Sequence, residues 1–322
     1  MTRSLYQAIA KLCLILGLFI VLSKAYSLSE VFIPQEVVQK FLNGYSESEL
    51  ELIQDDLTNI RKLCFRNTTP MMSGEKIYLA TAGGPGAGKS TLLEIYLRNK
   101  KNFVYLDPDQ RALRFMINTY LQEFTNAKVS ENKVHTRTDW MKLLDKAYTK
   151  WRGSSNYIAS TLLNEAFKEG YNIAHGTTST SDQIGSLYQK LKDKEYKIHL
   201  LLSYATDDNR VKSLEHRTNN QNFTQNQPND SVIKGKLFSD RFPIYFQYAD
   251  EMEIYWVDHY LENATLAATL IRGKGMTVHN QNALKKFTEQ YDDDRKNKPL
   301  KPLKEYMEDF VQAKKLLAKE QE

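Results

Sequence analysis

The stretch GGPGAGKST, residues 83–91, constrains this chain more than any other part of its sequence. It fits the pattern Gly-x4-Gly-Lys-Ser, in which Gly83 comes first and Gly88, Lys89 and Ser90 close the motif. The glycines let successive backbone N–H groups turn inward around a polyphosphate, and the start of the following helix adds partial positive charge. An apolar run precedes the motif and a helical pattern follows it, so the sequence predicts a phosphate-binding loop rather than a structural turn.

Each part of this loop has an expected role in holding a nucleotide. The Lys89 ammonium would reach the β- and γ-phosphates, and the Ser90 hydroxyl would be the metal-binding group for Mg²⁺. The whole loop would surround the phosphates, which makes the expected nucleotide-binding residues Gly83, Gly84, Pro85, Gly86, Ala87, Gly88, Lys89, Ser90 and Thr91.

The order of predicted strands and helices favours an α/β fold. Short apolar segments predict five strands, at 76–82, 102–107, 171–175, 196–205 and 253–258. Helical patterns lie between them, at 110–124, 138–150, 155–169 and 180–194, and Gly170 is the expected C-cap of the third. Strands that alternate with helices form parallel sheets, so we expect a P-loop NTPase/kinase-like parallel sheet with helices on both faces.

The chain divides into four predicted sections, and both ends are helical extensions of the central one. A capping box at Ser46 and Glu49 opens a helix in the second section. The sections are a signal peptide or N-terminal anchor (1–25), a helical lead-in (26–74), a P-loop kinase domain (75–290), and a charged linker followed by an amphipathic helix (291–322).

The first 25 residues have the pattern of an export signal. Arg3 and Lys11 are basic, residues 12–22 carry no charge, and small residues lead to a cleavage site after Ala25. An uncleaved membrane anchor is the alternative, with membrane contact only through residues 1–25. We therefore expect a chain that is exported or membrane-anchored, with a cytoplasmic site of action because ATP is scarce outside cells.

Composition adds few constraints. The net charge is +5, and no block of Lys and Arg is dense enough to predict a nucleic-acid partner. Of the two cysteines, Cys13 lies in the apolar N-terminal run, so Cys64 is expected to be a small buried apolar residue. Cysteine and histidine do not cluster at the spacing of a zinc site.

The segment LDPDQR, residues 106–111, ends the second predicted strand with two acids and an arginine. In a P-loop kinase the neighbouring strand commonly delivers a carboxylate that takes the proton from the attacking hydroxyl. Asp109 is therefore the expected catalytic base, and Arg111 is expected on the substrate side. The alternative is that Asp109 only caps a helix that starts near Gln110. The fourth predicted strand lacks the acid that a motor or switch protein carries, which also favours a kinase.

The order of these motifs resembles the zeta toxin family of P-loop kinases. The resemblance covers roughly residues 75–260 and rests on the P-loop, on LDPDQR, on EGYNIAHGTTS at 169–179, and on a basic polar loop after the fourth strand. Zeta toxins transfer the γ-phosphoryl group of ATP to a hydroxyl of UDP-N-acetylglucosamine. The resemblance thus implies ATP and Mg²⁺ as cofactors, a sugar nucleotide as acceptor, Asp109 as base, and an antitoxin-like protein as a partner.

Several further site residues follow from this resemblance. The family places an acid before Gly-Thr after the third strand, where this chain has His175-Gly176-Thr177. His175 and Thr177 are expected to contact the substrate, although a strand-end histidine and a helix-capping threonine are the alternatives. Arg152 is expected on the substrate side because it precedes a predicted helix, and capping of that helix is the alternative. Arg217 is the expected catalytic lid arginine, and the second lid cation is expected to be Lys236 or Arg241.

The sequence therefore predicts a phosphotransferase with an alcohol group as acceptor. Its leading substrate is UDP-N-acetylglucosamine or a related sugar nucleotide. Two alternatives stay open because His175 replaces an acid. One is a P-loop kinase of another small acceptor, such as an antibiotic or a nucleoside, and the other is an inactive nucleotide-binding interaction protein.

Overall fold

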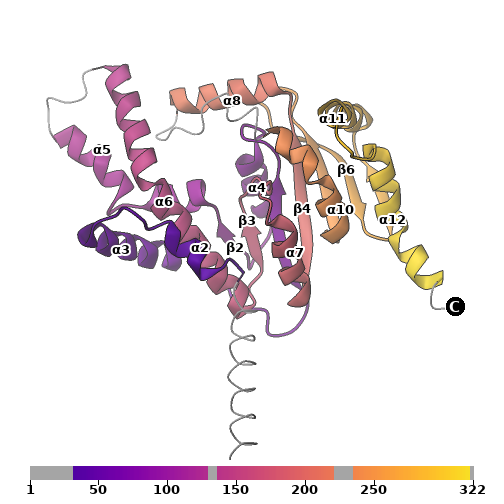
Figure 1. The fold of residues 1–322 in the computed structure, drawn as a ribbon, viewed down its shortest axis with the longest axis horizontal. Helices are drawn as coiled ribbons and strands as arrows, with labels where there is room; N and C mark the ends of the chain where they lie inside the picture. Colours follow the sequence, from indigo (N-terminus) through magenta and orange to yellow (C-terminus); the bar gives the residue numbers. More distant parts are fainter. Residues whose placement is uncertain (1–31, 130–135, 221–234, 320–322) are drawn as a thin grey trace, which may run out of the picture.

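A seven-stranded sheet, in the order β2-β3-β1-β4-β5-β6-β7, organises the chain (Figure 1). This computed structural model describes residues 32–129, 136–220 and 235–319, so the predicted export signal lies outside the described residues. The first five strands are parallel, and the last two are antiparallel. They are β1 (Lys76–Ala82), β2 (Val104–Leu106), β3 (Ile173–His175), β4 (Tyr196–Tyr204), β5 (Glu251–Trp256), β6 (Thr265–Ile271) and β7 (Gly275–Val278). The predicted parallel sheet is confirmed, and β6 and β7 add an antiparallel edge that the sequence analysis missed.

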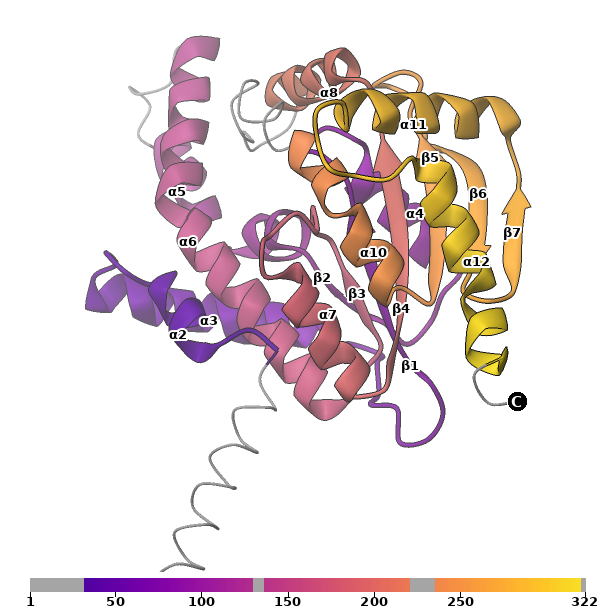
Figure 2. The same ribbon diagram turned by 45° about the vertical axis from the view of Figure 1, so that its right-hand side comes forward.

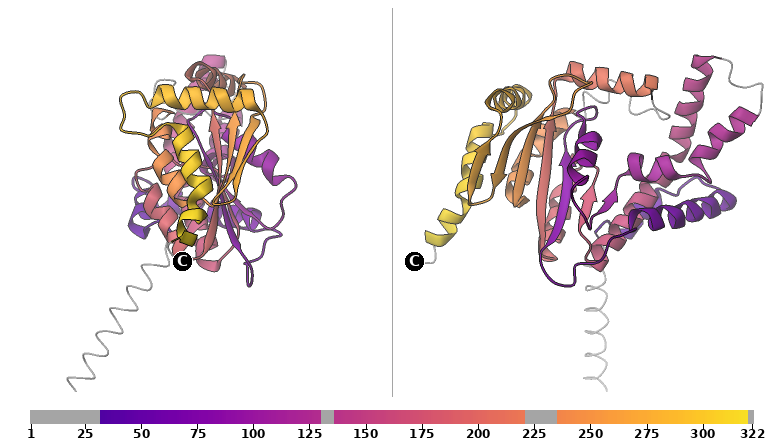
Figure 3. Two further views of the ribbon diagram at one scale, coloured as in Figure 1. Left: turned by 90° about the vertical axis from the view of Figure 1, so that its right-hand side faces the viewer. Right: turned by 180° about the vertical axis from the view of Figure 1, so that it is seen from behind.

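Helices cover both faces of this sheet, as the views from front and back show (Figures 2 and 3). Helix α4 packs on β1 and β4 from one side, and α7 and α10 cover the other side. Helices α11 and α12 pack against the strands at the β7 end, whereas α3 and α6 pack against β2 at the opposite end. Their bounds are α2 (Gln35–Lys40), α3 (Glu47–Cys64), α4 (Lys89–Leu97), α5 (Tyr120–Val129), α6 (Arg137–Glu169), α7 (Ile184–Asp193), α8 (Asp207–Asn220), α10 (Phe242–Tyr248), α11 (Gln281–Asp294) and α12 (Leu303–Lys319).

Alternation along the strands creates two unequal cores. Tyr78 and Ala80 of β1 face the larger one, which also receives the apolar faces of α3, α6, α7 and α10. Leu79 faces the smaller one, which α4 closes with Leu92 and Leu93. Cys64 is buried in the larger core, as expected, and burial raises the pKa of its thiol to about 11.

Two predicted helices, 138–150 and 155–169, are wrong as separate elements, because α6 runs unbroken through WRGSS. The hydroxyls of Ser154 and Ser155 donate to backbone carbonyls within the helix. Gly153 is needed there because a Cβ atom would lie 2.6 Å from the carbonyl oxygen of Phe41. The break in the pattern therefore marks a close approach of the lead-in to α6 rather than a helix end. The predicted end at Gly170 is confirmed, with φ of 77°.

The predicted helix at 110–124 is also wrong in its start. The chain forms a π-helical turn, η1 (Pro108–Ala112), and a 3-10 turn, η2 (Leu113–Phe115), before α5 begins. Asp56 of α3 holds the two residues that precede α5, since its buried carboxylate accepts from the N–H of Asn118 at 2.9 Å and from the hydroxyl of Thr119 at 2.6 Å. At the other end of the chain, α11 extends to Asp294 and takes up part of the predicted linker at 291–302.

Within the part of the chain that the structure describes, no helix is long and apolar enough to span a membrane.

We predict that Asp56→Ala lowers the free energy of unfolding by roughly 1–3 kcal/mol, because it leaves buried donors of Asn118 and Thr119 without an acceptor. Urea unfolding followed by circular dichroism measures the change. Asp55→Ala is the matched control, since Asp55 is exposed on the same helix and its removal should change stability by less than about 0.5 kcal/mol. Equal losses in the two variants would contradict the role of Asp56.

Candidate active site

The phosphate-binding loop lies between β1 and α4, at the carboxyl end of the sheet (Figure 1). Gly86 has φ of 81°, and a Cβ atom there would lie 2.3 Å from the carbonyl oxygen of Arg210. Gly83 is equally restricted, because a Cβ atom would lie 2.3 Å from the carbonyl oxygen of Ser203. The Ser203 hydroxyl in turn donates to the carbonyl of Ala87 at 2.5 Å. The loop is therefore shaped by close backbone contacts with β4 and α8.

Lys89 lies inside this loop rather than in solvent. Its ammonium donates to the carbonyl of Gly84 at 2.8 Å. The pKa of Lys89 is lowered from 10.5 to about 7, mainly by burial and then by the positive charges of Arg217 and Arg210, while Asp107 and Asp109 raise it by less. An anionic ligand would relieve this repulsion between cations.

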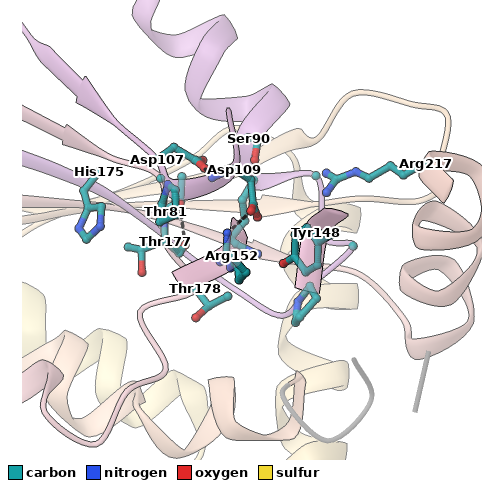
Figure 4. Close-up of a pocket in the computed structure, with 16 residues that line it drawn as sticks. Thr81, Ser90, Asp107, Asp109, Tyr148, Arg152, His175, Thr177, Thr178 and Arg217 are labelled. Carbon is teal, nitrogen blue, oxygen red and sulfur yellow. Dashed lines mark hydrogen bonds and ion pairs between the residues drawn. The ribbon is translucent and has the colours of Figure 1, made fainter. Parts of the chain in front are cut away.

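A cavity of about 210 Å³ opens beside the loop and joins four parts of the fold (Figure 4). The loop and the ends of β1, β2 and β3 form its floor, and α6 and α8 reach it from the sides. Its lining residues are Thr81, Pro85, Gly86, Gly88, Lys89, Ser90, Asp107, Pro108, Asp109, Tyr148, Arg152, His175, Gly176, Thr177, Thr178 and Arg217. The structure therefore brings together most of the site residues that the sequence predicts.

Asp107, not Asp109, is the residue that caps the turn after β2. One of its carboxylate oxygens accepts from the backbone N–H groups of Asp109 and Gln110, at 2.8 and 2.9 Å. Its other oxygen lies 2.1 Å from the position that a Cβ atom on Gly176 would occupy. Burial, and then the charge of Asp109, raise the pKa of Asp107. The N-cap of η1 is therefore Asp107, and the capping alternative for Asp109 is wrong.

Asp109 points across the cavity toward α6. It forms an ion pair with Arg152, whose guanidinium lies 5.6 Å from the ring centre of Tyr148 (Figure 4). Arg152 and Tyr148 are four residues apart and so share one face of α6. The expectation that Arg152 precedes a helix is wrong, because it lies within α6. Its neighbour Tyr148 was missed, although the spacing of four could have indicated it.

Arg217 reaches the cavity from α8, and Figure 4 draws it to the right of Asp109, with His175 at the left. The charges of Asp109 and Asp107 raise its pKa, but burial has the larger effect and the net shift is downward. Arg210, on the same helix two turns earlier, is buried beside the loop and its guanidinium donates to the carbonyl of Pro85 at 3.4 Å. Arg210 was missed, and its spacing of seven from Arg217 was the available signal.

The two expected second lid cations do not line this cavity. Arg241 donates to the carbonyl of Thr180 at 3.1 Å and pairs with Asp182 on the surface. Lys236 is exposed, near the start of the third described range. Arg210 is the cation that the fold places against the loop instead, because α8 begins directly after β4.

His175 lines the cavity but turns toward the core. Its Nδ1 lies 2.7 Å from the hydroxyl of Tyr78, and burial lowers the pKa of its imidazole to about 4. His175 is therefore neutral at pH 7. Thr177 accepts from the N–H of Ser179 at 3.1 Å, as a turn-forming threonine does. Arg111, an expected substrate residue, instead stacks over the ring of Tyr105 and is absent from the cavity lining.

A second cavity, of about 480 Å³, continues from the loop between α4 and α8. Gly86, Gly88 and Arg217 line both cavities, so the two meet at the phosphate loop. Thr91 of the predicted loop faces this second cavity. Its other walls are largely aromatic or aliphatic and include Leu92, Ile95, Tyr96, Tyr255, Tyr260 and Leu261.

Several solved structures align with this chain at low sequence identity. The native AvrRxo1-ORF1:-ORF2 complex aligns with a TM-score of 0.52 and 12% identity, over 86% of this chain and 90% of that chain. The AvrRxo1-ORF1:-ORF2 structure with ATP aligns with a TM-score of 0.51 and 12% identity, over 80% and 77%. A structure from the PezAT toxin–antitoxin system of Streptococcus pneumoniae gives a TM-score of 0.45 and 15% identity, over 79% and 96%. No curated protein sequence matches the chain.

A family model is more specific than these structures. The model described as zeta toxin matches residues 65–234, just over half of the chain. The matched range contains the phosphate loop, Asp109, the α6 face and both arginines of α8.

We predict that Gly176→Ala destabilises the site, because its Cβ atom would collide with the Asp107 carboxylate and disturb the cap of η1. The free energy of unfolding should fall by about 1–3 kcal/mol, measured by urea unfolding. Gly185→Ala is the control: its Cβ atom would meet only Ile244 side-chain atoms at 3.7 Å, and alanine should stabilise α7 by about 0.5–1 kcal/mol. A neutral Gly176→Ala would show that the contact with Asp107 relaxes without cost.

Proposed function

The chain belongs to the zeta toxin family, and we propose that it is an ATP-dependent kinase whose acceptor is a hydroxyl of UDP-N-acetylglucosamine or a related sugar nucleotide. One observation carries the proposal. A carboxylate, Asp109, faces the same cavity as the loop residues Lys89 and Ser90 and the lid residue Arg217. A base, a phosphate-binding cation and a second cation around one cavity are what phosphoryl transfer to an alcohol needs.

The two cavities fit the parts of ATP. The smaller one is lined by the loop and by cations, which suits the phosphates. The larger one begins at the same loop and offers the rings of Tyr96, Tyr255 and Tyr260, which suit an apolar, planar base. The related fold of AvrRxo1-ORF1:-ORF2 has been solved with ATP, which agrees with this assignment.

Mg²⁺ fits the oxygen groups at the centre of the site. The Ser90 hydroxyl and the Asp107 carboxylate both line the cavity. Burial raises the pKa of Asp107, and a bound cation would favour its ionised form. Carboxylate and hydroxyl oxygens are ligands that Mg²⁺ accepts. When bound, the ion would neutralise charge on the phosphates, and Ser90 and Asp107 would hold it.

The residues of the chain divide the work of transfer among them. Asp109 takes the proton from the acceptor hydroxyl while the oxygen of that hydroxyl bonds to the γ-phosphorus. The bond between the γ-phosphorus and the bridging oxygen breaks, and this oxygen leaves with the β-phosphate of ADP. Arg152 orients the Asp109 carboxylate through their ion pair. Lys89 and Arg217 offset the negative charge on the phosphoryl oxygens. The products are a phosphorylated sugar nucleotide and ADP.

The replacement of an acid by His175 need not remove activity. His175 is neutral at pH 7 and bonded to Tyr78, so it adds no charge at this position. The Asp107 carboxylate lies against Gly176, the next residue, and supplies an acid there from the neighbouring strand. Asp107 therefore supports catalysis over the alternative of an inactive nucleotide-binding protein.

The place of action and the partner follow from the same proposal. We propose that an exported or anchored chain acts on a cytoplasmic sugar nucleotide, because its donor is found inside cells. The AvrRxo1-ORF1:-ORF2 structure, whose fold is similar, is a complex of two proteins, which supports a protein partner that controls this kinase.

We predict that Asp109→Asn lowers the rate of transfer about 10²–10⁴-fold, because the amide cannot take the proton. The full-length protein is assayed with labelled ATP and Mg²⁺ against a panel of sugar nucleotides, antibiotics and nucleosides. Asp55→Asn, exposed on α3, is the control and should keep the full rate. Transfer by Asp109→Asn at the rate of the native chain would exclude Asp109 as the base. ATP binding by the native chain without transfer to any acceptor would favour the alternative of an inactive nucleotide-binding interaction protein.

We also predict that polyphosphate binding takes up a proton at pH 8. The pKa of Lys89 is about 7 in the free protein, so the amine is mostly neutral at pH 8, and bound phosphate raises the pKa and protonates it. The phosphates themselves are already ionised at that pH. Below about pH 6 Lys89 is charged in both states, and the uptake vanishes.

Calorimetry of ATP binding in buffers of different ionisation enthalpy measures this uptake, which should approach one proton per chain. Lys89→Met should abolish it, and Lys62→Met, exposed on α3, should keep it. Proton uptake that persists in Lys89→Met would assign the effect to another group.

A further inference from the structure

A second group of chemically reactive side chains lies away from the kinase site, on the face of the sheet that α4 covers. His199 is on β4, and Glu251 and Glu253 are on β5. His199 pairs with Glu251 in the parallel ladder, and the next pair on the same face is Leu201 with Glu253. All three side chains therefore point to one face, because residues two apart in a strand share a face.

The imidazole nitrogen of His199 faces both carboxylates. Its Nε2 lies 3.7 Å from an oxygen of Glu251 and 3.5 Å from an oxygen of Glu253. One ligand atom from each of the three residues lies within 4.8 Å of the others. The residue is 9% exposed, and its Nε2 is buried without a hydrogen-bond partner among the described residues. A buried polar atom of this kind is costly unless something binds it.

Neighbouring tyrosines orient these groups. The hydroxyl of Tyr96 lies 3.3 Å from Nδ1 of His199, and the hydroxyl of Tyr255 donates to Glu253. In the tautomer that binds a metal ion through Nε2, the ring proton is on Nδ1 and is shared with Tyr96, and the lone pair of Nε2 points toward the two carboxylates. A cation between them would then bind all three groups. Outer hydrogen bonds of this type, to the second nitrogen of a histidine and to a carboxylate, are usual around metal ligands.

We propose that His199 Nε2 and the carboxylates of Glu251 and Glu253 bind a divalent transition-metal ion of the Zn²⁺ and Mn²⁺ class. A tetrahedral Zn²⁺ site with bonds of about 2.1 Å separates its ligand atoms by roughly 3.4 Å, close to the distances from Nε2. The Glu251 side chain is 38% exposed, which gives the ion an entry path and leaves room for water as a further ligand. One imidazole and two carboxylates favour Zn²⁺ over Mn²⁺, and both over Mg²⁺.

The bound ion would influence the wall of the larger cavity through two tyrosines. Tyr96 and Tyr255 line that cavity, and their hydroxyls contact the two ligands His199 and Glu253. An ion that fixes these ligands also fixes the tyrosine rings and ties β4 to β5. The proposed metal site shares no residue with the phosphate loop, so it can be tested independently of the kinase proposal.

The test is calorimetric titration of the full-length protein with ZnCl₂, without nucleotide and with Mg²⁺ in excess to occupy any magnesium site. We expect the native chain to bind one equivalent of Zn²⁺, and this binding should require His199, Glu251 and Glu253. His199→Gln and Glu253→Gln should weaken it more than about 100-fold, since even outer-shell changes cost 10–100-fold, and Tyr96→Phe should fall within that smaller range. His279→Gln is the matched control, because His279 is exposed and bonded to Thr269 on the far edge strands, and it should bind as the native chain does.

Glu251→Gln keeps the test decisive if a buried variant misfolds, because this partly exposed side chain can change without disturbing the core. Circular dichroism establishes that it is folded, and its Zn²⁺ affinity should fall at least about 10-fold. Absence of Zn²⁺ binding by the native chain would overturn the proposal. Equal affinity in the native chain and in folded Glu251→Gln and His199→Gln variants would also overturn it.

Discussion

Hydrogen bonds between the ends of neighbouring parallel strands hold the site together. Thr81, at the end of β1, donates to the carbonyl of Thr177 at 2.7 Å and accepts from its N–H at 3.1 Å. Gly83 donates to the carbonyl of Thr178 at 3.2 Å, and Gly176 donates to the carbonyl of Leu106 at 2.8 Å. These bonds lock the phosphate loop, the turn after β2 and the turn after β3 into one rigid edge. Every functional side chain on those turns depends on that edge for its position.

Charge balance is the second constraint on the site. Lys89, Arg210 and Arg217 converge on the loop, and Asp107 and Asp109 lie across from them. Burial works against the charged form of each of these groups whose pKa is shifted, so the arrangement without ligand is electrostatically costly. A polyphosphate and its metal ion offset both sets of charges at once. The site is thus built for an anionic ligand before one arrives, which is how a preorganised electrostatic site reduces reorganisation during the reaction.

The helices around the sheet divide recognition between two sides. Helix α6 brings Tyr148 and Arg152 to the side of Asp109. Helix α8 brings Arg210 and Arg217 to the side of the phosphates, and α4 and the segment after β5 enclose the larger cavity. The proposed metal cluster lies beneath this second side, where Tyr96 and Tyr255 connect it to the cavity wall. In the proposed function, acceptor recognition and nucleotide recognition therefore rest on different helices.

The sequence by itself determined the phosphate loop, the five parallel strands and the roles expected of Lys89 and Ser90, because these depend on local patterns. A glycine motif between an apolar strand and a helix has few alternatives, and apolar runs of strand length indicate a buried parallel sheet. Only the tertiary structure decided which acid caps η1, that WRGSS continues α6, and that Arg210 rather than Lys236 or Arg241 contacts the loop. It also turned His175 toward Tyr78, moved Arg111 out of the cavity, and brought His199 to Glu251 and Glu253. The contacts of His175 with Tyr78 and of His199 with Glu251 and Glu253 join residues far apart in the chain, so no local pattern encodes them. The cap of η1 by Asp107 is local, but two nearby acids could each have formed it.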